Sequence, residues 1–195
     1  MRSFRAVHWI PFAFLMAACR RDDVQTYRVP KEEPPAAAMA GLEGPASRAA
    51  GGPRWKAPGG WVEQPATAMR AGSFLVERGG GRADVSIVTL AGDAGGDLSN
   101  VNRWRDQLGL KPLGPDELAG ALRPVALGGK TYKVLDAVSA APMLEGGRRK
   151  RTVAAILKRP DATWFFKMTG DDATVGAVRP EFERFLAGVR FEDAR

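Results

Sequence analysis

The chain has 195 residues, of which 45% are hydrophobic and 26% are charged, which suits one domain with its own core. Lys and Arg total 29 against 22 Asp and Glu, so the formal net charge is +7. The one cysteine, Cys19, and the one histidine, His8, both lie near the N-terminus. The rest of the chain therefore excludes a disulfide framework, a Cys/His zinc site and a Ser/His/Asp triad. No apolar run approaches the ~20 residues of a membrane-spanning helix.

Residues 1–18 have the three parts of an export signal. Arg2 and Arg5 supply the positive charge, residues 9–18 form an uncharged run, and small side chains then lead into Cys19. The uncharged run is typical of a signal core and too short to cross a bilayer as a helix.

The stretch Leu15–Cys19 resembles the lipobox of bacterial lipoproteins, although Met16 stands where leucine is commoner. The resemblance implies that the Cys19 thiol receives a diacylglyceryl group, that the signal is cut before it, and that the new amino group is acylated. Two or three acyl chains hold a protein stably at a membrane. We therefore expect a lipid-anchored protein of the cell envelope, at the periplasmic face or in the outer membrane. The alternatives are an ordinary cleaved signal and a buried helix.

Residues 19–54 are predicted to form a flexible tether after the lipidated cysteine. Residues 30–53 contain 16 Ala, Pro or Gly among 24, so this segment has little apolar surface to bury. Its expected role is to hold the folded domain away from the membrane. Tyr27–Lys31 is alternatively a docking peptide.

The globular domain is predicted over residues 55–195. Trp55 and Trp61 flank a turn-rich start and are expected to pack at the edge of the core. Strands over 68–78 and 83–90 follow, joined by a polar, glycine-rich hairpin loop. The second strand has no fully polar face, which favours a sheet covered on both sides.

Helical spacing of Val101, Trp104 and Leu108 predicts a helix that starts at Asp97 and ends at Gly109. Further elements follow in chain order: a short helix with Pro115 in its first turn, strands over 131–139, 152–158 and 163–169, a helix marked by Val175, Val178, Phe182, Phe185 and Leu186 with Pro180 near its start, and an edge strand over 189–191. This order predicts an α+β fold, an antiparallel sheet flanked by helices in an α/β/α sandwich.

The chain contains the stretches Trp55 to Trp61, Gly92–Gly96, Asn100–Arg105, Thr163–Gly170 and Phe182 to Leu186. Together these stretches resemble a group of uncharacterised bacterial lipoproteins. More distantly, the order of elements is similar to the PsbP-like, Mog-like and DcrB-like sandwich domains, a resemblance that implies an accessory or protein-binding role. The residues by which those families bind partners do not map onto this chain, and fold alone does not give function.

Loops that suggest chemistry have simpler interpretations. Gly128–Thr131 imitates the end of a phosphate-binding loop, but Pro124 occupies the place of its earlier glycine, which favours a hairpin turn. Gly92–Asp97 has the composition of an amide nest or a weak cation site. Its carboxylates have the wrong spacing for a calcium loop, so we expect a turn in which Asp97 or Ser99 caps the helix. No metal and no cofactor are expected.

A polar helix face supplies the candidate interaction surface. Asn100, Asn102, Arg103 and Arg105 are predicted to lie near Asp93, where two guanidiniums and two amides would grip an anionic or peptide partner. The alternative is an ordinary solvated helix face.

Arg148–Arg151 is a run of four consecutive basic residues. It lacks interleaved aromatic residues, so no nucleic acid is expected as a partner. Removal of Arg2 and Arg5 with the signal would leave 27 basic against 22 acidic residues, a net charge of about +5 that favours weak attraction to anionic envelope surfaces.

The sequence therefore predicts a membrane-anchored envelope lipoprotein whose domain acts without catalysis, as an interaction or accessory module with a protein partner. One alternative is a domain that binds a small ligand near Asp93 and Arg103. The other is a hydrolase that uses carboxylates or a Ser–Lys pair, although no G-x-S-x-G elbow exists.

Overall fold

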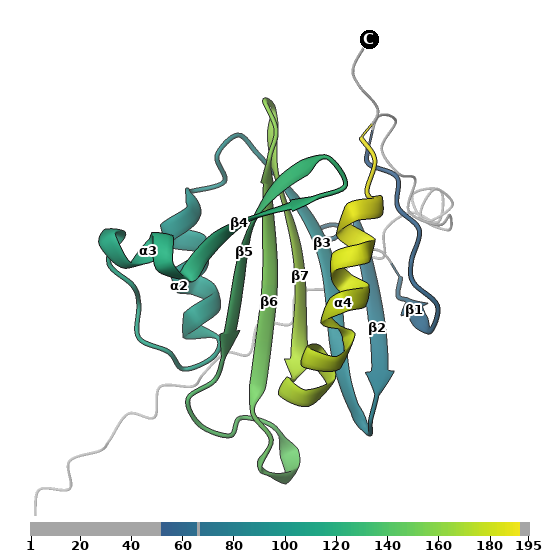
Figure 1. The fold of residues 1–195 in the computed structure, drawn as a ribbon, viewed down its shortest axis with the longest axis vertical. Coiled ribbons are helices and arrows are strands. Elements are labelled where there is room, and N and C mark those ends of the chain that lie inside the picture. The colour runs from purple at the N-terminus through teal and green to yellow at the C-terminus, as the bar shows by residue number, and fades with distance from the viewer. Residues whose placement is uncertain (1–51, 66, 192–195) are drawn as a thin grey trace, which may run out of the picture. The chain divides into compact units, whose positions relative to one another are not determined.

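An antiparallel sheet of seven strands dominates the computed structural model, which describes residues 52–65 and 67–191 (Figure 1). The strand order is β1-β2-β3-β7-β6-β5-β4. The structure confirms the predicted α+β fold. The strands are β1 (Trp61–Glu63), β2 (Gly72–Arg78), β3 (Gly81–Ala91), β4 (Leu122–Leu127), β5 (Lys130–Val138), β6 (Lys150–Lys158) and β7 (Ala162–Asp171), and the helices are α2 (Asp97–Asp106), α3 (Pro115–Ala121) and α4 (Asp172–Gly188).

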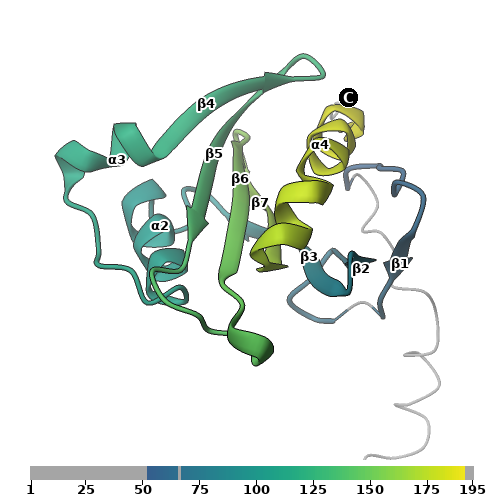
Figure 2. The ribbon, with the colours of Figure 1, turned by 60° about the horizontal axis from the view of Figure 1, so that its bottom comes forward.

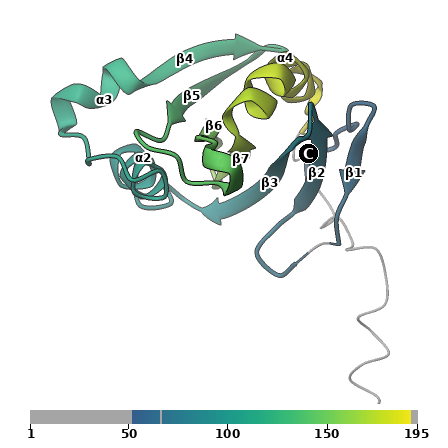
Figure 3. The ribbon, with the colours of Figure 1, turned by 90° about the horizontal axis from the view of Figure 1, so that it is seen from below.

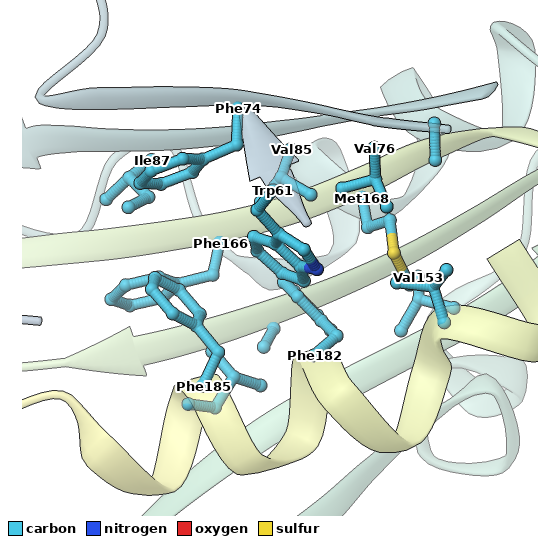
Figure 4. Close-up of a cluster of buried hydrophobic side chains, with 14 of the residues drawn as sticks. Trp61, Phe74, Val76, Val85, Ile87, Val153, Phe166, Met168, Phe182 and Phe185 are labelled. Atoms are coloured by element: carbon cyan, nitrogen blue, oxygen red, sulfur yellow. The ribbon is translucent and has the colours of Figure 1, made fainter. Parts of the chain in front are cut away.

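Helix α4 covers one face of the sheet with an aromatic cluster (Figure 4). Side chains alternate along a strand, so Phe166 on β7 points to this face, together with Phe74 on β2. Phe182 and Phe185 of α4 pack on them, and the rings of Phe185 and Trp61 lie 5.4 Å apart. Full burial of one such side chain is worth roughly 1.5–3 kcal/mol, so this cluster is the main source of stability.

Helix α2 packs on the opposite face, as Figure 3 shows. Its Trp104 meets Phe165 of β7 edge to face, with ring centroids 5.8 Å apart, and Val101 and Leu108 flank this contact. The buried partners of α2 come from β4, β5, β6 and β7, and Val88 of β3 adds a partly buried contact. Among the described residues no member of β1 or β2 belongs to this second cluster, so α2 does not cover these two strands.

Most predicted boundaries lie close to the observed ones. Helix α2 gives way to a turn that closes at Gly109, which has a φ of 63°, and Leu110 N donates to Arg105 O at 3.0 Å. Strand β2 starts at Gly72, later than predicted, because residues 67–70 form a turn.

Two features of the helices and strands differ from prediction. Helix α4 begins at Asp172, where the Asp171 carboxylate accepts a hydrogen bond from Thr174 N at 3.1 Å, so Pro180 lies inside the helix and not near its start. Strand β4 was not predicted, because it contains Pro124. It lies at the edge of the sheet beside α3, where a missing N–H is tolerated (Figure 2).

The end of the domain is held by a short backbone bridge. Arg54 and Arg190 exchange two backbone hydrogen bonds of 2.7 and 2.8 Å, so the predicted edge strand over 189–191 is an isolated bridge instead. The predicted signal, the lipidated cysteine, the alternative docking peptide Tyr27–Lys31 and residues 19–51 of the predicted tether lie outside the described residues. The last residue of that predicted tether, Arg54, is instead bonded to the folded domain. No helix of the described part is long and apolar enough to cross a membrane.

Substitution of Gly170 in β7 tests the close packing of the strands. A Cβ on Gly170 would lie 2.2 Å from the carbonyl oxygen of Arg82 and 2.6 Å from Ala83 Cα, and neither backbone atom can turn away. We expect Gly170→Ala to lower the free energy of unfolding by about 1–3 kcal/mol in urea titrations. Gly120→Ala, with no atom near its Cβ, is the control and should change it by less than about 1 kcal/mol. Equal effects of both substitutions would contradict the structure.

Candidate functional site

The loop before α2 is built on residues with positive φ. Gly92, Gly95 and Gly96 have φ of 58°, 81° and 82°, and Ala94 has 51°. Asn100 closes the loop, because its Nδ2 donates to Ala94 O at 2.9 Å and to Gly96 O at 2.7 Å. Asn100 is 2% exposed, so its amide serves the loop and not the surface.

The two carboxylates of this loop are neutralised by lysines from the sheet. Lys158 pairs with Asp93, and it also lies 3.3 Å from Asp97, which Lys133 contacts as well. Burial of Asp97 opposes its ionisation, but the hydrogen bonds from Lys133 and Lys158 outweigh it and lower the pKa of Asp97. Gly96 is the N-cap residue, and no side chain caps α2. The loop is therefore a turn pinned to β5 and β6.

The rest of the predicted interaction surface also contacts the chain itself. Asn102 clamps Leu113, since its Nδ2 donates to Leu113 O at 3.0 Å and its Oδ1 accepts from Leu113 N at 2.7 Å. Arg105 Nε donates to Lys111 O at 2.9 Å. Arg103 is exposed, and its guanidinium donates to Asn100 Oδ1.

The structure thus gives the predicted surface a structural role without testing its role in binding. Asp93, Asn100 and Asn102 hold loops in place, and Arg105 adds a bond to the connection after α2. Arg103 has no carboxylate partner among the described residues. Binding by this face stays a prediction, and Arg103 is its best-placed member.

A cavity of about 220 Å³ opens beside Arg103, between α2 and the sheet. Its walls include Trp104 of α2, Phe165 and Lys167 of β7, and Arg70 from the turn before β2. Three cationic side chains thus meet an apolar floor. Lys167 and Arg70 were not predicted as site residues. One signal was present for Lys167, which interrupts the otherwise apolar run from Trp164 to Met168.

Lys167 is the least satisfied charge of this cavity. It is half-buried, and Nζ makes one long hydrogen bond to Gln107 Oε1, at 3.4 Å, and no ion pair with any described residue. Burial lowers the pKa of Lys167 below the ordinary lysine value. Asp84 opposes this shift, whereas Arg70, Lys150 and Arg103 add to it. Asp84 is itself paired with Arg70 at 3.0 Å.

A larger groove of about 860 Å³ lies farther along the same sheet face. It runs between the β2–β3 turn and the connection from β5 to β6. Arg148 braces it, because its guanidinium lies 3.3 Å from Asp171 and donates to Gly80 O at 3.4 Å. The two hollows are neighbours. Asp84 and Thr169 of the groove are paired across β3 and β7, and the next pair on the same face is Ser86 and Lys167 of the cavity.

Exposed apolar side chains gather on this face. The large hydrophobic residues that are exposed in the described part are Val62, Met69, Leu90 and Met143, at 59%, 72%, 37% and 48%. Met69 and Leu90 line the cavity, and Met143 lines the groove. Val62 stands opposite Leu75, which is a groove residue. We call this surface the open face.

Two arginines of the basic run over 148–151 form ion pairs with different carboxylates. Arg148 pairs with Asp171, while Arg151 makes a two-pronged contact with Asp136, both bonds being 2.7 Å, and lies 3.4 Å from Asp172. The run is therefore not a continuous patch of unpaired charge. Among the described residues no three His, Cys, Asp or Glu side chains are grouped as a metal site would need.

Comparison with known proteins finds similarity in structure only. No protein-family model and no curated protein sequence matches this chain. LpqN, involved in cell envelope biogenesis of Mycobacterium tuberculosis, is 12% identical, with 72% of this chain and 83% of LpqN covered and a TM-score of 0.44. CyanoP, the PsbP of Synechocystis, is 12% identical, with 74% and 89% covered and a TM-score of 0.45.

A Bacteroides thetaiotaomicron protein is also 12% identical, with 72% of this chain covered and a TM-score of 0.44. The chain spans only 45% of that protein's length. A PsbP protein is thus among the similar structures. Similarity at this level transfers no function.

The lysine–carboxylate cluster at the loop predicts a pH-dependent stability. The pKa of Asp97 is lower in the folded chain than its ordinary value of 3.8, so its contribution is complete above that pH and is lost as the pH falls through the lowered value. We expect Asp97→Asn to destabilise the protein at pH 7, and the difference from wild type to shrink below about pH 4. Urea unfolding at pH 7, 5 and 3 measures this. Asp106→Asn, an exposed change on the same helix, should have little effect at any of these pH values. A deficit of Asp97→Asn that is the same at pH 3 would contradict the ion-pair role.

Proposed function

We propose that this chain is a lipid-anchored lipoprotein of the cell envelope and that its α+β domain acts without catalysis, as an interaction or accessory module. The observation that carries the proposal is the open face, which leaves apolar and cationic side chains uncovered beside two hollows. The N-terminal sequence supplies the anchor. The partner on the open face is a protein of the envelope.

The anchor rests on the order of charge, apolar run and small residues before Cys19. Acylation of this cysteine would fix one end of the chain in a bilayer, and the tether over residues 19–54 would let the domain reach a partner. Fully extended, this tether would span on the order of 100 Å, at about 3.3 Å for each residue. A flexible connection of this length favours a module that searches for a partner near the membrane.

The open face has the composition of a protein-binding surface. Methionine and arginine are enriched in interfaces, and Met69, Met143 and Arg148 all lie here. Exposed apolar surface marks sites of association, and Val62, Met69, Leu90 and Met143 contribute exposed apolar side chains to this face. The opposite face offers no such site at its centre, because α4 covers it (Figure 1).

Lipid attachment is tested by growing cells with labelled palmitate. We expect label in the wild-type protein and none in Cys19→Ser, because the thiol and the amino group of that cysteine are the predicted acceptors. Ser47→Ala lies in the predicted tether and should keep the label. Label that enters Cys19→Ser equally would overturn the anchor.

The open face is tested by co-purification from membranes solubilised in mild detergent. A stoichiometric protein partner should accompany the wild-type chain and be lost from the double variant Val62→Glu, Met143→Glu, because both side chains are exposed on the open face. Arg184→Glu, an exposed change on α4, should keep the partner. Circular dichroism checks that all variants are folded. A partner retained by the folded double variant, or the absence of any stoichiometric partner, would contradict the proposal.

A further inference from the structure

The small cavity beside α2 combines an excess of positive charge with an apolar floor. Arg70, Arg103 and Lys167 line it, and the nearby carboxylate of Asp84 is already paired with Arg70. A cavity wall with two cations that lack a carboxylate partner attracts an anion, and the low local polarity strengthens that attraction.

Among the three cations of the cavity, Lys167 has the least complete hydrogen bonding. Its half-buried ammonium carries three N–H donors but has one hydrogen bond, of 3.4 Å, to Gln107. Leaving a buried charge without a partner costs free energy, so a sheet position of this kind is normally occupied by an apolar residue. Phe165 on β7 and Ala154 on β6 are apolar neighbours of Lys167 on this face, while Ser86 of β3 stands opposite it and Thr169 follows it on β7. A ligand with an acidic group would complete the hydrogen bonds of Lys167.

The apolar part of the cavity wall indicates the size and the apolar character of the rest of the ligand. Trp104 is held against Phe165 by an edge-to-face contact, so both rings are fixed before anything binds. Met69 and Leu90 stand at the exposed rim. A volume of about 220 Å³ lies below the roughly 300–1,000 Å³ of sites for drug-sized molecules, so the ligand is small.

We propose that this cavity binds a small organic anion, with its carboxylate or other acidic group on Lys167 and Arg103 and a flat or branched apolar body against Trp104 and Phe165. The site is separate from the lipid anchor and from the groove lined by Met143. It adds a ligand to the interaction module and does not depend on a protein partner.

Calorimetric titration of the purified chain tests the site, with the same detergent in the cell and the syringe. The probe is 2-naphthoate, and its neutral analogue 2-naphthamide and inorganic phosphate are the comparisons. We expect 2-naphthoate to bind with a dissociation constant below 1 mM, which is about −4 kcal/mol. The other two should bind at least 10-fold more weakly, since each lacks the charge or the apolar body.

Substitutions then locate the binding. Lys167→Met keeps the length of the side chain and should weaken 2-naphthoate binding at least 10-fold, while the folded protein should resist urea as well as or better than wild type. Arg103→Gln should weaken it several-fold. Lys111→Met removes one exposed charge away from the cavity and should leave binding unchanged.

Three results would overturn the proposal: no binding of 2-naphthoate to the wild type, equal binding of 2-naphthamide, or unchanged binding in Lys167→Met. Loss of stability in Lys167→Met would assign that lysine a structural role instead. None of these results bears on palmitate labelling or on the partner of the open face, so the failure of this site and the failure of the proposed function are distinguishable.

Discussion

One helix is too narrow to cover a sheet of seven strands. Strands lie about 4.8 Å apart, so this sheet is roughly 29 Å wide, whereas a helix with its side chains is about 10–12 Å across. On one face the sheet curves around α4 (Figure 3). Trp61 of β1 packs against Phe182 and Phe185 of that helix. On the other face α2 has ten residues and sits over the strands at the β5 to β7 side. The outer strands β1, β2 and part of β3 therefore keep an uncovered surface, and the two hollows follow from this unequal cover.

The periodicity of hydrophobic residues predicted most of the helices and strands. Alternation in Thr163–Thr169 placed Phe166 and Met168 on one face and Phe165 and Lys167 on the other, as observed. Such patterns succeed because burial on each face selects side chains independently of distant contacts. The same patterns did not predict strand β4, because it contains Pro124, which argues against a strand. The proline is tolerated because β4 lies at the edge of the sheet.

The candidate site was much less predictable, because its bonds join residues that are distant in sequence or belong to the backbone. Asn100 and Asn102 have the side chains of a binding face, but the carbonyl groups of Ala94 and the backbone of Leu113 occupy them. Asp97 meets Lys133 only because β5 lies beside α2. The cavity at Lys167 likewise needs α2, β7 and the turn at Arg70 to come together, and no local pattern encodes that meeting.

We propose that a protein partner covers the open face of this domain in the cell envelope. Methionine oxidation by dilute peroxide, followed by mass spectrometry, tests this directly, because Met69 and Met143 are exposed on that face while Met168 is buried. We expect Met69 and Met143 to oxidise readily in the purified chain and to be protected in isolated envelopes. Met168 should oxidise slowly in both preparations. Equal oxidation of Met69 and Met143 in the two preparations would contradict it.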